Sequence, residues 1–153
     1  MEAAFPPSTA MARALDEARR AAEAGEVPVG AVVTDLQGRV VAAAHNRTRS
    51  DADPTAHAEL LVIRAAAVAR GVERLVGCTI WVTLEPCAMC AGAISHARLA
   101  RLVYAAPDPK GGAVEHGPRI FAHPTCHHRP EVVSGVGEQE AASLLRGFFQ
   151  QRR

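Results

Sequence analysis

The sequence lacks the features that mark several large classes of protein. Its longest uncharged stretch rich in apolar residues, 86–97, has 12 residues and includes a histidine, whereas a membrane-spanning helix needs about 20 consecutive apolar residues. Four cysteines in 153 residues are too few for a scaffold held by disulfides. The first residues carry neither the basic segment nor the apolar run of a secretory signal. We therefore expect a cytoplasmic protein with no membrane partner.

Lysine and aromatic residues are also scarce. Lys110 is the single lysine beside 16 arginines, and aromatic residues make up 4% of the chain. The net charge of +1 divides into 0, −1 and +2 over residues 1–50, 51–100 and 101–153, so the basic stripe typical of nucleic-acid-binding proteins is missing. A length of 153 residues with 48% hydrophobic residues predicts one globular domain over 1–153.

Helical and strand patterns alternate along the chain. Asp35-Leu36-Gln37-Gly38 has the composition of a hairpin turn, and the later strand–helix–strand–helix–strand order predicts a parallel core with helices on both faces. We therefore expect a three-layer α/β/α sandwich around one mixed five-stranded sheet. Residues 107–130, rich in Pro, Gly and His, are expected to be irregular. The patterns predict helices over 9–24, 56–70, 87–96 and 138–151, and strands over 27–34, 39–44, 79–84, 102–105 and 131–136.

Three residues have the spacing of a metal site: His57, Cys87 and Cys90. His57 opens one predicted helix, and Cys87 opens the next one directly after Pro86. Free N–H groups and partial positive charge at a helix N-terminus favour thiolate over thiol. Two thiolates and one imidazole favour Zn²⁺, and three protein ligands leave the fourth tetrahedral position open to water, as in catalytic zinc sites.

Glu59 supplies the second half of the predicted site. It lies two residues after His57 on the same helix, so it can approach a metal-bound water without being a ligand. A carboxylate there can accept a proton from that water and return it to a leaving group.

Other interpretations of the cysteines remain open at this point. A Cys-x-x-Cys pair is also typical of redox sites, although such a site does not require His57 and Glu59. A structural zinc would need a fourth protein ligand. Cys78 is expected to be a buried small residue, and Glu85 to support the entry to the helix rather than to catalyse. The candidates for a fourth ligand are His123, Cys126, His127 and His128.

The pattern His57-Ala-Glu59 followed by Pro86-Cys87-Ala-Met-Cys90 is the signature of zinc nucleobase deaminases. Beyond it, nearly the whole chain resembles the bacterial tRNA-specific adenosine deaminases of the cytidine-deaminase-like fold. The two metal motifs are shared across that fold and indicate the chemistry, whereas the flanking matches are more specific for the substrate. The stretches that carry the resemblance are 26–33, Asn46-Arg47, 53–59, 83–93, 108–112, His128-Arg129, Phe148-Phe149 and Arg152-Arg153.

The resemblance implies one zinc per chain and a proton shuttle at Glu59. Activated water would attack C6 of adenine, and Glu59 would protonate the ring nitrogen and later the departing ammonia. The product would be inosine at the wobble position of a tRNA anticodon, and the protein would be a homodimer that binds the anticodon stem-loop. The implied substrate-binding residues are Asn46 near the flipped nucleotide, Asp108 and Lys110 in a loop at the anticodon, and Phe149 and Arg153 in a helix that flanks the RNA.

Each implied substrate contact has a structural alternative. Asn46 could cap a turn, and the charged residues could be ordinary solvated groups of a loop or a helix end. Phe148 and Phe149 are adjacent in a helix, so they cannot both face one core. One ring is therefore expected in the core and the other free to stack on a base.

The chain departs from the family pattern over residues 113–127. The best-known tRNA enzymes carry a small Gly-Ser element where Glu115 and His116 stand, and an Asn in place of His127. These changes put the substrate in question rather than the zinc chemistry. A second hypothesis is therefore the same chemistry on free guanine, cytosine or cytidine, with the C-terminus folded over the pocket as a lid. A third is a non-catalytic, zinc-stabilised binding module, which would have no need of Glu59.

Overall fold

Five strands form one mixed sheet in the computed structural model, which describes residues 7–152 of the chain. Their order is β2-β1-β3-β4-β5, with β1 antiparallel to both of its neighbours and β3, β4 and β5 parallel. Arg153, one of the expected substrate-binding residues, lies outside the described residues. The strands are β1 (Gly30–Thr34), β2 (Val40–His45), β3 (Thr79–Leu84), β4 (Arg101–Ala106) and β5 (Glu131–Ser134).

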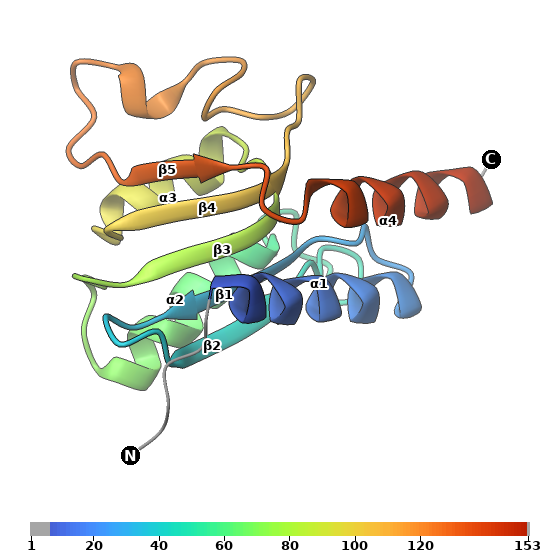
Figure 1. Ribbon diagram of the computed structural model, residues 1–153, viewed down its shortest axis with the longest axis horizontal. Helices are drawn as coiled ribbons and strands as arrows, with labels where there is room; N and C mark the ends of the chain where they lie inside the picture. Colours follow the sequence, from blue (N-terminus) through green and yellow to red (C-terminus); the bar gives the residue numbers. More distant parts are fainter. Residues whose placement is uncertain (1–6, 153) are drawn as a thin grey trace.

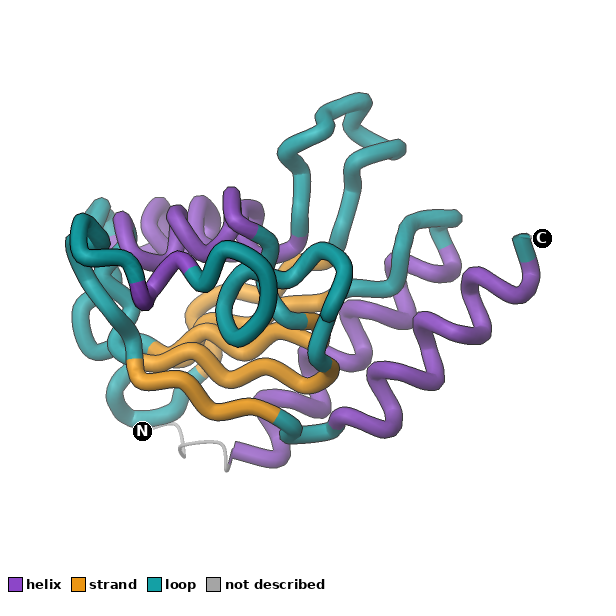
Figure 2. Tube along the Cα trace, turned by 90° about the horizontal axis from the view of Figure 1, so that it is seen from above, coloured by secondary structure: helices purple, strands orange, loops and turns teal. Residues whose placement is uncertain are grey.

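Two helices cover each face of the sheet (Figures 1 and 2). Successive side chains of a strand point to opposite faces, so Trp81 joins the core under α1 and α4, while its neighbour Ile80 joins the core under α2 and α3. The predicted α/β/α sandwich is confirmed. The helices are α1 (Pro7–Glu23), α2 (Ala58–Arg70), α3 (Ala88–His96) and α4 (Glu138–Gln151).

The first strand is shorter than its apolar run predicts. β1 begins at Gly30 instead of residue 27, because Pro28 has no N–H to give to a ladder. At Gly30, α1 crosses directly over the strand, and a Cβ there would lie 2.0 Å from the carbonyl oxygen of Ala14. The residues before the strand are thereby left to line a cavity.

The turn and the long segment match their predictions. Asp35 accepts the N–H groups of Gln37 and Arg39, and Gly38 has a φ of +83°, so the hairpin is confirmed. Residues 107–130 hold only the short 3₁₀ turn η1 (Ile120–Ala122). β5 ends at Ser134, two residues early, because Gly135 takes a φ of +85° that a strand cannot continue.

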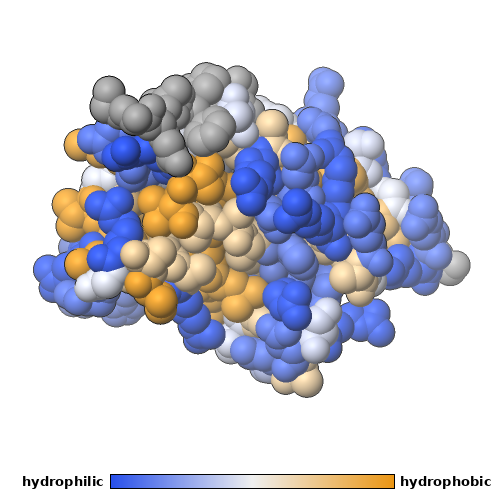
Figure 3. Space-filling model, turned by 90° about the horizontal axis from the view of Figure 1, so that it is seen from below, coloured by the Kyte–Doolittle hydropathy of each residue, from blue (hydrophilic) through white to orange (hydrophobic). Residues whose placement is uncertain are grey.

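Hydrophobic side chains gather on one face of the molecule. Every residue of β2 is partly exposed, and the face seen from below has hydrophobic groups gathered toward its centre with hydrophilic ones around them (Figure 3). Within residues 7–152, none of the helices has the length and apolar character needed to cross a membrane.

Candidate active site

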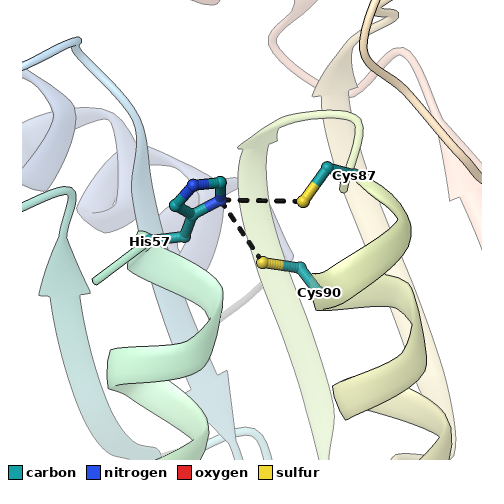
Figure 4. A group of neighbouring side chains, drawn as sticks. All are labelled: His57, Cys87 and Cys90. Carbon is teal, nitrogen blue, oxygen red and sulfur yellow. Dashed lines mark hydrogen bonds between the residues drawn. The ribbon is translucent and has the colours of Figure 1, made fainter. Parts of the chain in front are cut away.

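The site lies where α2 and α3 begin. His57 is the N-cap of α2 and Cys87 is the N-cap of α3, and both have extended backbones with ψ of 149° and 176°. Neither side chain caps its own helix, so both are free to point across the gap between the two helices. Cys90, in the first turn of α3, points into the same gap (Figure 4).

The three side chains meet at distances that suit a shared metal. His57 Nδ1 lies 3.7 Å from Cys87 Sγ and 3.6 Å from Cys90 Sγ, and the three ligand atoms all lie within 4.8 Å of one another. Tetrahedral zinc with ordinary Zn–S and Zn–N bonds separates such ligands by about 3.6 Å. The donor set and its spacing therefore fit a divalent metal that prefers sulfur and imidazole.

The thiols differ in their tendency to ionise. Hydrogen bonding from Cys90 and then from His57 lowers the pKa of Cys87 to about 4. The same contact with Cys87, together with burial, raises the pKa of Cys90, and the contact with Cys87 raises the pKa of His57. The Cys87 sulfur is thus ready to bind a cation as a thiolate, and a cation between the sulfurs would favour ionisation of both.

Glu59 lies beside this cluster and is not one of its ligands. Its side chain is buried, with 4% of the residue exposed. Burial is the main cause that raises the pKa of Glu59 to about 7. A carboxyl group with that pKa can both take up and release a proton near neutral pH.

A cavity of about 360 Å³ opens over the cluster. Its walls are largely apolar with a few polar groups, the composition of a small-molecule site. Asn46 is 7% exposed and Asp108 is half-buried, and both line the cavity. The full lining is Val27, Val29, Asn46, Thr48, His57, Ala58, Glu59, Leu84, Glu85, Cys87, Asp108 and Gly111.

The other expected substrate residues lie elsewhere. Lys110 is exposed and does not line the cavity. Phe148 is buried while Phe149 is 50% exposed, so the predicted division between one core ring and one free ring is confirmed. Phe149 lines a separate hollow on α4 with Leu145, Arg146 and Gln150.

Cys126 and His128, two of the alternative metal ligands, are held by other partners. Cys126 contacts Ser95, and the imidazole Nε2 of His128 is 2.7 Å from the carbonyl oxygen of Leu99. Within residues 7–152, His57, Cys87 and Cys90 form the one group of three or more potential ligands close enough to share an ion, so no fourth protein ligand joins them. Cys78 is fully buried, as expected.

Sequence reasoning missed the buried Glu26. Its carboxylate accepts the backbone N–H and the hydroxyl of Ser50, both at 2.6 Å, and the backbone N–H of Arg49 at 3.1 Å. These bonds fix the loop that leads from Asn46 toward α2. A signal was present, because Glu26 opens the stretch 26–33 that resembles the deaminases.

Comparison with known proteins agrees with this geometry. The family model of MafB19-like deaminases matches residues 7–153. A tRNA-specific adenosine deaminase of Agrobacterium fabrum is 59% identical over 94% of this chain and 93% of its own length. The chain belongs to the family of the bacterial tRNA-specific adenosine deaminases.

Further family members are similar over comparable lengths. The tRNA-specific adenosine deaminase of Bacillus subtilis is 45% identical over 94% of this chain and 88% of its own length. A solved structure from a study of A-to-I editing by tRNA:A34 deaminases at the wobble position has a TM-score of 0.88 and 58% identity, over 90% of this chain and 99% of that one. The family predicted from the sequence, and the fold predicted with it, are confirmed.

Proposed function

We propose that this protein is a zinc-dependent hydrolase that converts adenosine to inosine at position 34 of tRNA, as a cytoplasmic homodimer. The observation that carries the proposal is the cluster of His57, Cys87 and Cys90 beside the buried Glu59, at the base of a cavity. The similarity to tRNA-specific adenosine deaminases over nearly the whole chain supports the choice of substrate.

His57, Cys87 and Cys90 are the residues that would hold the zinc ion. When bound, zinc supplies a Lewis acid that lowers the pKa of water to near neutrality. His57 and Cys87 can bind a metal through their side chains while their backbones still begin the two helices. The N–H of Leu61 donates to the carbonyl of His57, and the N–H of Ala91 donates to the carbonyl of Cys87.

Glu59 carries the protons of the reaction. Its carboxylate takes a proton from the attacking water and gives it to the ring nitrogen next to C6. A second proton passes through the same carboxylate to the exocyclic amine, which leaves as ammonia, while the oxygen of the water stays on C6. A pKa near 7, caused mainly by burial, suits a group that must be base and acid in turn.

The walls of the cavity would hold the base. Asn46 offers an amide donor and acceptor beside Glu59, and the side chains of Val27, Val29 and Leu84 offer apolar surface for a purine ring. C6 of adenine is inaccessible within a base stack, so an RNA substrate must extrude the nucleotide.

The residues around the opening of the cavity favour a polymeric substrate over a free base. Asp108 and Gly111 lie at one wall with the exposed Lys110 between them, where a flanking nucleotide would pass. None of the described residues that line the cavity comes from α4, so the lid expected of an enzyme for free bases is lacking there. The exposed ring of Phe149 is available for stacking.

The decisive experiment supplies purified protein with an A34-containing tRNA and, separately, with free guanine, cytosine, cytidine and adenosine. Inosine at position 34, detected as a change from A to G after reverse transcription, is the expected result. A G34 version of the same tRNA is the matched control. Deamination of a free base with no inosine in the tRNA would overturn the proposed substrate and keep the chemistry.

Two further parts of the proposal have direct measurements. We expect one zinc per chain by elemental analysis of the purified protein. The homodimer rests on the family resemblance, and sedimentation equilibrium tests it by giving a mass of twice 16.1 kDa. A monomer that deaminates the tRNA at full rate would refute the dimer alone.

A further inference from the structure

The carboxylate of Glu85 is the centre of a cluster that the proposed mechanism does not use. Glu85 follows β3, its side chain is fully buried, and it lies two residues before Cys87. Its Oε1 accepts the N–H of Asp108 at 3.0 Å. Its Oε2 accepts three successive backbone N–H groups at 3.0–3.1 Å, those of Val114, Glu115 and His116.

The segment 108–116 is therefore folded around one carboxylate. Gly112 makes this possible, because a Cβ there would lie 2.5 Å from both the carboxyl carbon of Glu85 and the carbonyl oxygen of Asp108. Asp108, the first residue of the segment, accepts the N–H groups of Lys110 and Gly111 within its own turn. The cavity wall formed by Asp108 and Gly111 thus depends on how firmly the segment holds Glu85.

The side chain of His116 closes this arrangement. Its Nδ1 lies 2.7 Å from Oε1 of Glu85, the same oxygen that accepts the N–H of Asp108. The neighbouring side chain is anchored too, since the buried Tyr104 on β4 donates its hydroxyl to Glu115. Glu115 and His116 are thus both held by side-chain contacts.

We propose that His116 is a positioning residue, which clamps the segment 108–116 through Glu85 and so holds the cavity wall firmly in place for the RNA. The RNA substrate in this proposal rests on the proposed function, whereas the contacts of His116 with Glu85 do not depend on it. A segment held in its bound shape before the substrate arrives has less conformational entropy to lose on binding. Releasing His116 therefore weakens binding of the polymer and leaves the chemical step at Glu59 nearly intact.

The test compares His116→Ala, His116→Asn and the wild type on an A34 anticodon stem-loop. His116→Ala is expected to raise KM about tenfold with kcat within about twofold, the loss typical of one hydrogen bond to a charged group. His116→Asn places an amide N–H near the position of Nδ1 and is expected to restore KM to within about threefold. His123→Ala is the matched control, since His123 belongs to the same irregular region and its ring contacts the carbonyl of Pro118.

Hydrogen exchange on the same proteins tests the clamp without any substrate. In His116→Ala, peptides covering 108–116 are expected to exchange about tenfold faster, and peptides covering α2 to exchange as in the wild type. Unchanged exchange in 108–116 would overturn the clamp, whatever the substrate is. Faster exchange with an unchanged KM, or a fall in kcat alone, would overturn the positioning role. Absence of activity in the wild type would refute the proposed function, and the exchange result would still decide the clamp.

Discussion

Replacement of Glu59 by glutamine removes the proton carrier and almost nothing else. Glutamine has the same length and shape, so the buried position beside Cys90 stays filled. The three metal ligands are untouched, because Glu59 is not one of them. An amide can neither take a proton from water nor return one, so the variant separates the chemistry from the folding of the site.

The expected loss follows from the surroundings of Glu59 in the cavity. Among the described residues of the lining, two other carboxylates occur, and both bind backbone amides of the segment 108–116: Glu85 at its centre and Asp108 within its own turn. No second carboxylate is therefore free to replace Glu59 in either proton transfer. General acid–base catalysis contributes about 10²–10⁴-fold per group. With two transfers through one group, we expect kcat to fall at least about 10⁴-fold, which corresponds to about 5.5 kcal/mol in the barrier.

The assay measures single-turnover formation of inosine in an A34 anticodon stem-loop, together with zinc content and the thermal unfolding midpoint. Glu59→Gln should hold one zinc per chain and unfold within a few degrees of the wild type. Glu23→Gln, at an exposed glutamate in the last turn of α1, is the matched control and should keep full activity. Turnover within tenfold of the wild type, with zinc bound, would refute the role of Glu59. A variant that loses zinc would refute the claim that Glu59 is not needed to hold the metal.

Four further substitutions are expected to have separate effects. Cys90→Ser should lower zinc content and activity together, as elemental analysis and the tRNA assay would reveal, and full zinc occupancy would contradict the assigned ligand set. Glu26→Gln should destabilise the protein by about 2 kcal/mol at pH 7, since the N–H and hydroxyl donors of Ser50 lose a charged acceptor that is itself buried. Burial raises the pKa of Glu26, but the hydrogen bonds from Ser50 and Arg49 hold that pKa below its usual value. The stability that the Glu26 carboxylate contributes is therefore present above the unfolded pKa of about 4.3 and is lost as the pH falls through the lower folded pKa. Urea unfolding across pH 3–7 should show that the variant loses less stability on acidification than the wild type. Phe149→Ala should raise KM for the anticodon stem-loop about tenfold without moving the unfolding midpoint. Phe148→Ala should lower the unfolding midpoint. Equal destabilisation by the two substitutions would contradict the different burial of the two rings.

The elements that hold the metal were predictable because local signals and burial agree there. The apolar run 79–84 coincides with β3, and Gly71 takes the left-handed conformation that ends α2 as expected. The helices α2 and α3 begin one or two residues later than predicted, since His57 and Cys87 are N-caps rather than first-turn residues. That difference matters for the site, because the extended backbone of an N-cap residue lets its side chain point away from its own helix and toward the other ligands.

The walls of the cavity were not predictable in the same way. Val27 and Val29 alternate with Pro28 in an apolar run that looks like part of β1. Pro28 excludes part of this run from the ladder, and the crossing of α1 at Gly30 shows where the strand begins. Glu26 and Glu85 bind backbone N–H groups more than 20 residues away in sequence. A backbone donor leaves no mark in the identity of its residue, so most of the bonds that these carboxylates accept could not be predicted from the residue types of their partners.

Because these carboxylates bind mainly backbone N–H groups, the side chains of the loops around the metal cluster can differ while the paths of the loops stay the same. Glu26 shapes the loop on one side of the cavity and Glu85 the segment on the other, and both do so mainly through main-chain amides. Amides are present whichever side chains the loops carry, so the path of segment 108–116 does not require Glu115 or His116. What these two side chains add is a second set of contacts to an arrangement that is already formed. A variant that loses them should therefore keep its fold and its zinc, and change how tightly the cavity wall is held against the substrate.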